Sequence, residues 1–161
     1  MGARNCEELG VNLQKIVNRL LANEDLLKLL YYTDQDPLNQ QKTVPDKKEV
    51  FEEYLRITPR VGTKDTSHAI AIVYIMRAGK LGGNKEFKNV QIKIDVIVPL
   101  TQWAIMDTNF RMFAILGRIQ ESLDGKTING LGKIVGGDFE LNYGTDEVIC
   151  YQQTFELTEY D

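Results

Sequence analysis

The sequence predicts an α+β fold: an antiparallel β-sheet of about four to five strands packed by a central helix, with further helices near the N-terminus. Two observations lead to this prediction. Residues 89–98 alternate between apolar and polar side chains, which is typical of a strand with one buried face. Residues 107–124 repeat apolar side chains at helical spacing, which indicates a helix that packs on that sheet.

The N-terminal part of the chain predicts two helices. Residues 7–22 place Leu9, Leu13, Ile16 and Leu20 on one stripe. Asn23 then caps a second helix, over 24–32, which is apolar nearly all round. Such a helix is expected in the core or in a contact between subunits.

A long polar loop is expected over residues 33–48, since two prolines and no periodicity occur there. Loops of this length are usually functional. A short helix is predicted at 46–54, with Asp46 as its cap and Glu49 three residues later.

The strands are predicted next. Residues 57–61 read as an edge strand, because Pro59 cannot donate to a sheet ladder. Residues 69–76 form a continuous apolar run that favours a central strand. A glycine-rich loop over 77–88 connects this strand to residues 89–98 as a hairpin, and Pro99 ends the second strand.

The central helix is expected to begin near Asp107 as its cap and to end at Gly125. Its buried face is predicted to carry Met112, Phe113, Ile115, Leu116, Ile119 and Leu123. Its opposite face is predicted to carry Arg111, Arg118, Gln120 and Glu121.

The C-terminal part predicts a closing hairpin. Residues 139–143 alternate as a strand should, residues 144–147 turn the chain, and residues 148–158 form the last strand. Gln153 interrupts the apolar face of that strand. The glycines at 130, 132, 136 and 137 are expected in turns, bulges or close approaches of the backbone.

Composition indicates one domain over residues 1–161. A net charge of −4 argues against a general nucleic-acid binder, which needs a basic face. Cys6 and Cys150 suggest neither a disulfide framework nor a metal site. With no signal core near the N-terminus and no apolar run of the ~18 residues that a membrane helix needs, we expect a soluble protein without a membrane partner.

The sequence contains no complete motif for catalysis, cofactor binding or metal binding. Residues 124–127 lack the upstream glycine of a phosphate loop, and residues 130–136 are one residue too long for a dinucleotide fingerprint. Asp34 and Asp36 lack the glycine and glutamate of a calcium loop. His68 is the only histidine, so neither a zinc site nor a histidine-assisted nucleophile is indicated. We therefore expect no enzyme, no cofactor and no metal.

Interface residues are the remaining candidates. Trp103 lies in the linker after the 89–98 strand and is a candidate anchor. The loops supply the others: Asp34, Asp36, Lys80, Asn84 and Lys85.

Three stretches resemble tail-terminator (tail-completion, neck) proteins of tailed bacteriophages. They are VQIKIDVIVPLTQW at 90–103, FAILGRIQESLDGKTINGLG at 113–132, and YQQTFEL at 151–157. The order of elements over about residues 57–158 fits the same family.

The resemblance implies a structural virion protein that forms a ring, typically a hexamer, on the end of the tail tube. Such a ring stops polymerisation of the tube and joins the tail to the head. Its partners would be other copies of itself, tail-tube and sheath proteins and head-connector proteins, with DNA passing through the lumen without specific binding. The expected location is the virion tail or neck, and the host cytoplasm during assembly.

Two alternatives stay open. One is another head–tail connector component, such as a stopper, a head-completion protein or a tube-like protein, with more β-structure and a long hairpin. The other is a small ligand-binding α+β domain, for which the polar Gln153 on an apolar strand face is the only indication.

Overall fold

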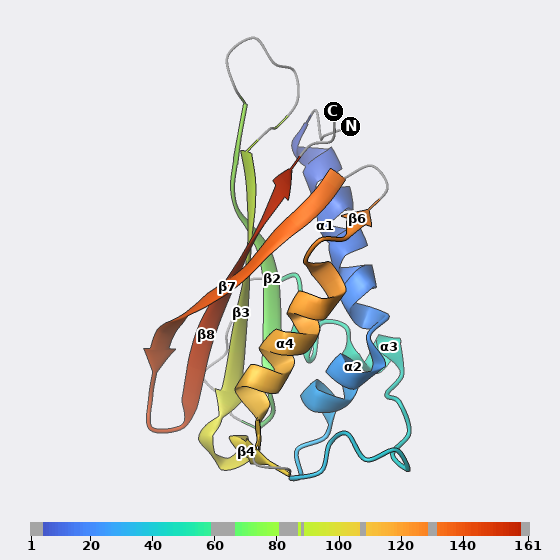
Figure 1. Ribbon diagram of the computed structural model, residues 1–161, viewed down its shortest axis with the longest axis vertical. Helices are drawn as coiled ribbons and strands as arrows, with labels where there is room; N and C mark the ends of the chain where they lie inside the picture. The colour runs from blue at the N-terminus through green and yellow to red at the C-terminus, as the bar shows by residue number, and fades with distance from the viewer. Residues whose placement is uncertain are drawn as a thin grey trace.

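A computed structural model describes residues 5–58, 67–80, 87, 89–106, 109–128 and 132–158 (Figure 1). Its helices are α1 (Cys6–Leu21), α2 (Glu24–Tyr31), α3 (Lys47–Val50), the 3-10 helix η1 (Leu100–Gln102) and α4 (Arg111–Leu123). Its strands are β1 (Leu55–Arg56), β2 (Ile70–Gly79), β3 (Asn89–Pro99), β4 (Ala104–Ile105), β5 (Asn109–Phe110), β6 (Thr127–Ile128), β7 (Gly132–Gly144) and β8 (Val148–Thr158).

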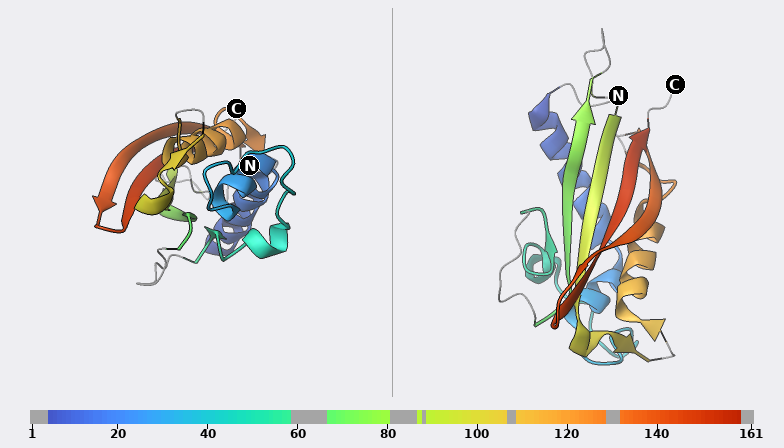
Figure 2. Two further views of the ribbon diagram at one scale, coloured as in Figure 1. Left: turned by 90° about the horizontal axis from the view of Figure 1, so that it is seen from below. Right: turned by 90° about the vertical axis from the view of Figure 1, so that its left-hand side faces the viewer.

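The predicted α+β class is confirmed. The main sheet has six strands in the order β1-β2-β3-β8-β7-β6, and β4 pairs with β5 in a small second sheet. All neighbours in the main sheet are antiparallel except β1 and β2, which are parallel. The sheet is strongly curled, and α1, α2 and α4 lie on one of its faces (Figure 2). Both predicted hairpins, β2–β3 and β7–β8, are present.

Apolar periodicity explains the core between the helices and the sheet. Alternate residues of β3, from Val90 to Val98, are buried beneath the helices, as the 89–98 pattern predicted. The predicted stripe of α1 is mostly buried, with Leu13 half-exposed. Asn23 caps α2 as expected, because its side-chain oxygen accepts from the amide of Leu26 at 3.1 Å.

The central helix differs from its prediction at its N-terminal end. It begins at Arg111 and not near Asp107, which lies outside the described residues, and two residues of β5 precede it. Arg111 was expected to face away from the sheet, yet it is fully buried. Phe113 was expected in the core, yet 39% of its surface is exposed. The helix ends near Gly125, as predicted, and Gly125 adopts a φ of 74°.

Two smaller predictions also need correction. The helix expected at 46–54 is only the single turn of α3, capped by Asp46. The edge strand expected at 57–61 does not include residues 57 and 58, which follow the short strand β1 at Leu55–Arg56; the rest of the expected strand, residues 59–61, lies outside the described residues. The chain leaves helical geometry at Phe51 and adopts a φ of 68° at Glu52, so the backbone turns into β1.

Strand β7 is longer than the predicted 139–143 segment. Its glycine-rich start pairs with β8, and the pairing register shifts between Gly136 and Asp138. Gly136 has a φ of 132°, and a Cβ there would lie 2.6 Å from the main-chain oxygen of Thr154. The bulge therefore requires glycine at this position, as the sequence predicted for this group of glycines.

Candidate functional site

Five aromatic rings meet where the β7–β8 hairpin extends past the start of α4. Phe113 has its ring centroid 6.2 Å from that of Trp103, 6.3 Å from that of Phe110, 6.0 Å from that of Phe139 and 5.6 Å from that of Tyr151. These spacings are those of favourable edge-to-face and tilted aromatic pairs. We call these five residues the aromatic surface.

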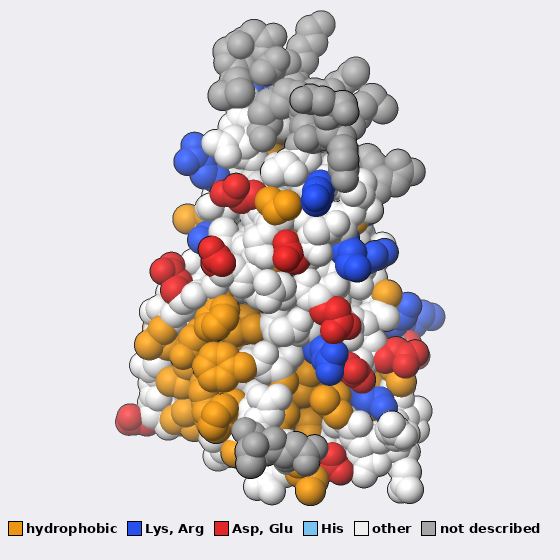
Figure 3. All heavy atoms as spheres, in the orientation of Figure 1, with side chains coloured by type: hydrophobic (Ala, Val, Ile, Leu, Met, Phe, Trp, Pro, Cys, Tyr) orange, Lys and Arg blue, Asp and Glu red, His pale blue; other side chains and the backbone are white. Residues whose placement is uncertain are grey.

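The aromatic surface is open to solvent. Phe110, Phe113 and Phe139 are each exposed over more than a third of their surface, and Trp103 and Tyr151 are half-buried. Apolar side chains gather over this part of the molecule, at the lower left of Figure 3, whereas Lys, Arg, Asp and Glu side chains are scattered above this patch and to its right. Contiguous apolar patches on a soluble protein commonly mark sites of protein–protein contact.

The distal half of β7 borders the aromatic surface. All residues from Asp138 to Gly144 are exposed, including Leu141 at 61% and Tyr143 at 39%. Strand β6 pairs with β7 only at Gly132 and Lys133, and no other described strand pairs with the outer edge of β7. An exposed, partly apolar strand edge of this length is a template for pairing with another chain.

A buried arginine fixes the position of α4 next to this surface. Arg111 Nε donates to the carbonyl of Gln102 at 3.0 Å, and its Nη1 donates to the carbonyls of Leu29 at 2.6 Å and Tyr32 at 2.8 Å. Its Nη2 donates to the carbonyl of Asp34 at 2.6 Å. Burial lowers the pKa of Arg111, and Asp34 partly opposes this effect. One side chain thus joins the end of α2, the start of the polar loop and the linker after β3.

The opposite face of the sheet carries a polar network. Tyr74 donates to the Asp95 carboxylate at 3.1 Å, and Gln152 Nε2 donates to the Tyr74 hydroxyl at 2.8 Å. Burial, then the Asp95 charge, raises the pKa of Tyr74 to about 12. Burial also raises the pKa of the nearby Cys150 thiol to about 12. Both groups stay protonated near neutral pH, so neither is activated as a nucleophile or base.

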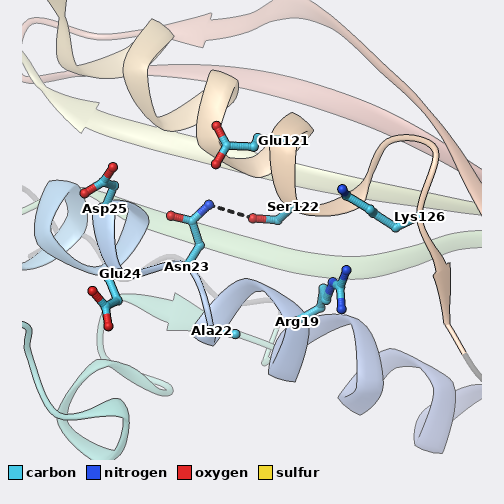
Figure 4. A pocket seen from close by; sticks show the side chains of 8 residues that line it. All are labelled: Arg19, Ala22, Asn23, Glu24, Asp25, Glu121, Ser122 and Lys126. Carbon is cyan, nitrogen blue, oxygen red and sulfur yellow. Dashed lines mark hydrogen bonds between the residues drawn. The ribbon is translucent and has the colours of Figure 1, made fainter.

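A shallow polar groove of about 490 Å³ lies between the α1–α2 turn and the end of α4 (Figure 4). Asn23 Nδ2 donates to the Ser122 hydroxyl at 2.9 Å, and that hydroxyl donates to the carbonyl of Arg118 at 2.9 Å. Ser122 is therefore engaged in structural hydrogen bonds. Arg19 and Lys126 lie toward one end of the groove and Asp25 toward the other, so its charges do not converge on one point.

The candidate interface residues lie in three different places. Trp103 belongs to the aromatic surface, as a half-buried ring. Lys80 is exposed, with its Nζ 4.9 Å from the ring centroid of Phe87. Asn84 and Lys85 lie outside the described residues.

Asp34 and Asp36 help to order the polar loop. The Lys42 ammonium forms an ion pair with the Asp34 carboxylate and donates a hydrogen bond to it. This hydrogen bond lowers the pKa of the Asp34 carboxyl. Asp36 accepts from Asn39 Nδ2 at 2.9 Å, and its carbonyl accepts from Lys42 at 2.6 Å. The amide of Met106 donates to the carbonyl of Gln35 at 2.7 Å, so the loop also contacts the linker after β3.

His68 and Gln153 are both buried. His68 Nε2 lies 3.1 Å from the Glu53 carboxylate, and its Nδ1 lies 3.0 Å from the carbonyl of Ala69. Gln153 Nε2 donates to the carbonyls of Leu116 at 3.2 Å and Gly137 at 3.1 Å. Among the described residues its Oε1 has no hydrogen-bond partner. A lone acceptor beneath a helix does not form the convergent set of polar groups that a ligand site needs.

Across the part of the chain that the structure describes, His, Cys, Asp and Glu side chains form no group of three or more that would hold a metal ion. No helix within that part is both long and apolar enough to cross a membrane.

Sequence reasoning identified one member of the aromatic surface, Trp103, and missed the others. The rings come from the linker after β3, from β5 and α4, and from both strands of the last hairpin. Only the curl of the sheet brings these segments together. One feature of the sequence pointed to this surface. Residues 139–143 alternate as a strand, and the sequence predicted a partner for that strand on one side only, in residues 148–158.

Comparison with known proteins places the chain in a family. No curated protein matches it. A family model named YomW matches residues 23–157, which covers everything from α2 to the end of β8 except the last residue of that strand. The chain is therefore a member of the YomW family, a family of phage-related proteins.

Proposed function

We propose that this protein is a tail terminator of a tailed phage: a structural subunit that forms a ring on the end of the tail tube, stops tail polymerisation and joins tail to head. The observation that carries the proposal is the aromatic surface beside the outer edge of β7, with which no described strand pairs from Asp138 to Gly144. Membership of a phage-related family and the resemblance of residues 57–158 to tail terminators support it.

The aromatic surface suits a contact between proteins for energetic reasons. Burying an aromatic side chain of this size contributes about 1.5–3 kcal/mol. Phe110, Phe113 and Phe139 are each exposed over 39–48% of their surface in the isolated chain. Covering that surface with a partner protein would therefore add to the free energy of binding. Aromatic residues are also those that most often dominate binding energy at interfaces.

The acidic character of the chain is compatible with a lumen through which DNA slides. The net charge is −4, and phosphate binding requires Lys and Arg. In this proposal the ring contacts other copies of itself, the tail tube, sheath proteins and head-connector proteins, and it does not hold DNA. Its location is the virion neck, after assembly in the host cytoplasm.

A tube-like or stopper protein of the head–tail connector is the second candidate. The long β7–β8 hairpin favours it, since strands of 13 and 11 residues are able to build a continuous sheet between subunits. The two candidates differ in the length of the assembly. A terminator gives single rings, whereas a tube-like subunit stacks into cylinders of increasing length.

The test uses tail tubes from the phage or prophage that encodes the chain. Purified protein is mixed with tubes, and negative-stain images show whether it caps one end. Phe139→Ser should abolish capping while the protein stays folded, and Val11→Ser serves as a matched control, since Val11 is 57% exposed on α1. Uncapped tubes with the unmodified protein would contradict the proposal, and long cylinders would favour the second candidate.

A further inference from the structure

We infer that the contact between neighbouring copies is a continuous β-sheet, in which the distal half of β7 of one copy pairs antiparallel with the free edge of β2 in the next copy. This inference rests on the proposed ring. It names which two edges of the same chain meet, and therefore which surface of the subunit is buried on assembly.

Among the described strands, β2 and β7 each have a segment with no partner on its outer side. Strand β1 covers β2 only at Ala71 and Ile72, and no other described strand pairs with the outer edge of β2 between Val73 and Gly79. At the other side of the sheet, the outer edge of β7 is unpaired among the described strands from Asp138 to Gly144. Each copy thus offers two complementary strand edges of similar length, one on each side.

Strand direction decides how these edges pair. Strands β2 and β8 are both antiparallel to β3, and β7 is antiparallel to β8, so β7 runs opposite to β2. When copies stand side by side in the same orientation, as in a ring, β7 and the next copy's β2 are antiparallel. Such a head-to-tail contact is heterologous and closes into a ring when the rotation between copies allows it.

The charges of the two edges are complementary. Residues 138–147 carry Asp138, Glu140, Asp146 and Glu147 and no basic residue. Residues 70–80 carry Arg77 and Lys80 and no acidic residue. Pairing either edge with its own counterpart in another copy would bring like charges together, which is unfavourable across a strand pair.

Centring the two free segments on one another gives a specific register. Arg77 then lies opposite Glu140, and Met76, the extra residue at the β2 register shift between Ile75 and Arg77, lies beside Leu141. Arg77 pairs with Gln91 and Glu140 pairs with Gln152, and all four belong to the sheet face that carries no helices. The register therefore places a basic and an acidic side chain directly opposite each other on the same face.

The register also fits the geometry of a closed sheet. Glu140 lies level with Ile72 through Gln152 and Asp95, and Arg77 lies level with Gln91. Bringing Arg77 opposite Glu140 therefore requires a stagger of four residues along β3, ~13 Å. Four strands, β2, β3, β8 and β7, separate successive junctions, a width of ~19 Å. The resulting strand tilt is about 35°, at the lower end of the range of about 35–45° found in closed β-barrels.

The test is site-specific crosslinking in a Cys6→Ser background, which removes the exposed natural thiol and leaves the buried Cys150. Arg77→Cys and Glu140→Cys are made on separate chains and oxidised mildly, either alone or mixed. The expected result is a disulfide dimer in the mixture at least tenfold above that of either variant alone. Gln40→Cys, on the exposed part of the polar loop, is the control: its disulfide dimers measure the crosslinking that arises from random collisions between chains.

Two results would overturn the inference. Dimers of Glu140→Cys alone, as abundant as in the mixture, would show that β7 pairs with β7. No dimer above the Gln40→Cys level in a sample that light scattering shows to be assembled would place the contact elsewhere, while leaving the proposed ring intact. A protein that never assembles, even with tail tubes, would remove the proposed function and this inference together.

A charge exchange provides an independent readout. Arg77→Glu should weaken association about two- to fivefold, the effect expected of one exposed ion pair. Adding Glu140→Lys to the same chain should restore it, because the opposite charges are then exchanged across the junction. An unchanged association constant in Arg77→Glu would contradict the register.

Discussion

Arg111 Nη1 donates a hydrogen bond to the main-chain carbonyl of Leu29 at 2.6 Å, which links the first residue of α4 to the last turn of α2. The same guanidinium donates to three further carbonyls, and no carboxylate of the described residues forms an ion pair with it. This arrangement holds the N-terminal end of α4, and with it Phe113, beside the last hairpin.

Replacing this arginine should be costly. Arg111→Met removes donors from four carbonyls in a buried site, and we expect a loss of about 3 kcal/mol or more in the free energy of unfolding. Urea denaturation of the variant and the unmodified protein measures this difference in the free energy of unfolding. Arg118→Met is the control, since Arg118 is partly exposed and its ion pairs with Asp25 and Glu121 are superficial; we expect a change within about 0.5 kcal/mol. Equal losses in the two variants would contradict the buried role of Arg111.

Two glycines should respond to alanine in opposite directions. In Gly136→Ala the new Cβ would lie 2.6 Å from the Thr154 oxygen at a φ of 132°, so we expect destabilisation of about 1–3 kcal/mol. Gly117 lies in α4 with nothing within 4 Å of an added Cβ, so Gly117→Ala should stabilise by about 0.5–1 kcal/mol. Thermal melts of both variants measure these changes, and stabilisation by Gly136→Ala would refute the bulge geometry.

Stability should fall at alkaline pH. Burial raises the pKa of Cys150 from 9.0 to about 12 and that of Tyr74 from 10.0 to about 12. In the unfolded chain both groups lose their protons at lower pH, so their contribution is fully present below pH 9 and is lost as the pH rises toward 12. Melting temperatures at pH 8, 10 and 11 should decrease, and Cys150→Ala should reduce the decrease. An equal decrease in that variant would contradict the role of the thiol.

The two thiols should differ in reactivity. Cys6 is exposed at the start of α1, whereas Cys150 is buried on the face of the sheet without helices. A thiol reagent at pH 8 should modify one thiol per native chain rapidly and the second only after denaturation, because the thiolate is the reactive form. Mass spectrometry after brief labelling identifies the modified residue. Rapid labelling of Cys150 in the native protein would contradict its burial.

Periodicity in the sequence predicted most of the secondary structure, and its failures have physical causes. The alternation in residues 89–98 placed β3 correctly because one face of that strand packs against helices. The glycines before Asp138 concealed the first half of β7, since glycine has low strand propensity and its role here depends on the bulge. Arg111 was misplaced because a helical pattern does not reveal that backbone carbonyls of other segments surround one position.

The candidate site was less predictable than the fold. Trp103 was identified from its type and its place in a linker, but its partners come from segments that only the curled sheet brings together. Phe113 looked like a core residue because it borders the apolar stripe of α4. In the structure its ring packs instead against the rings of Phe139 and Tyr151, and 39% of its surface stays exposed. Local patterns carry no information about the curl of the sheet.

The mass of the assembled protein tests the central claim, that the chain forms a closed ring. Light scattering combined with size exclusion, over a range of concentrations and with tail tubes as template, gives this mass directly. We expect a single species that is a small whole-number multiple of the 18.4 kDa chain, six copies if the ring is a hexamer, and dissociation on Phe139→Ser. A monomer at every concentration that also fails to bind tube ends would contradict the claim.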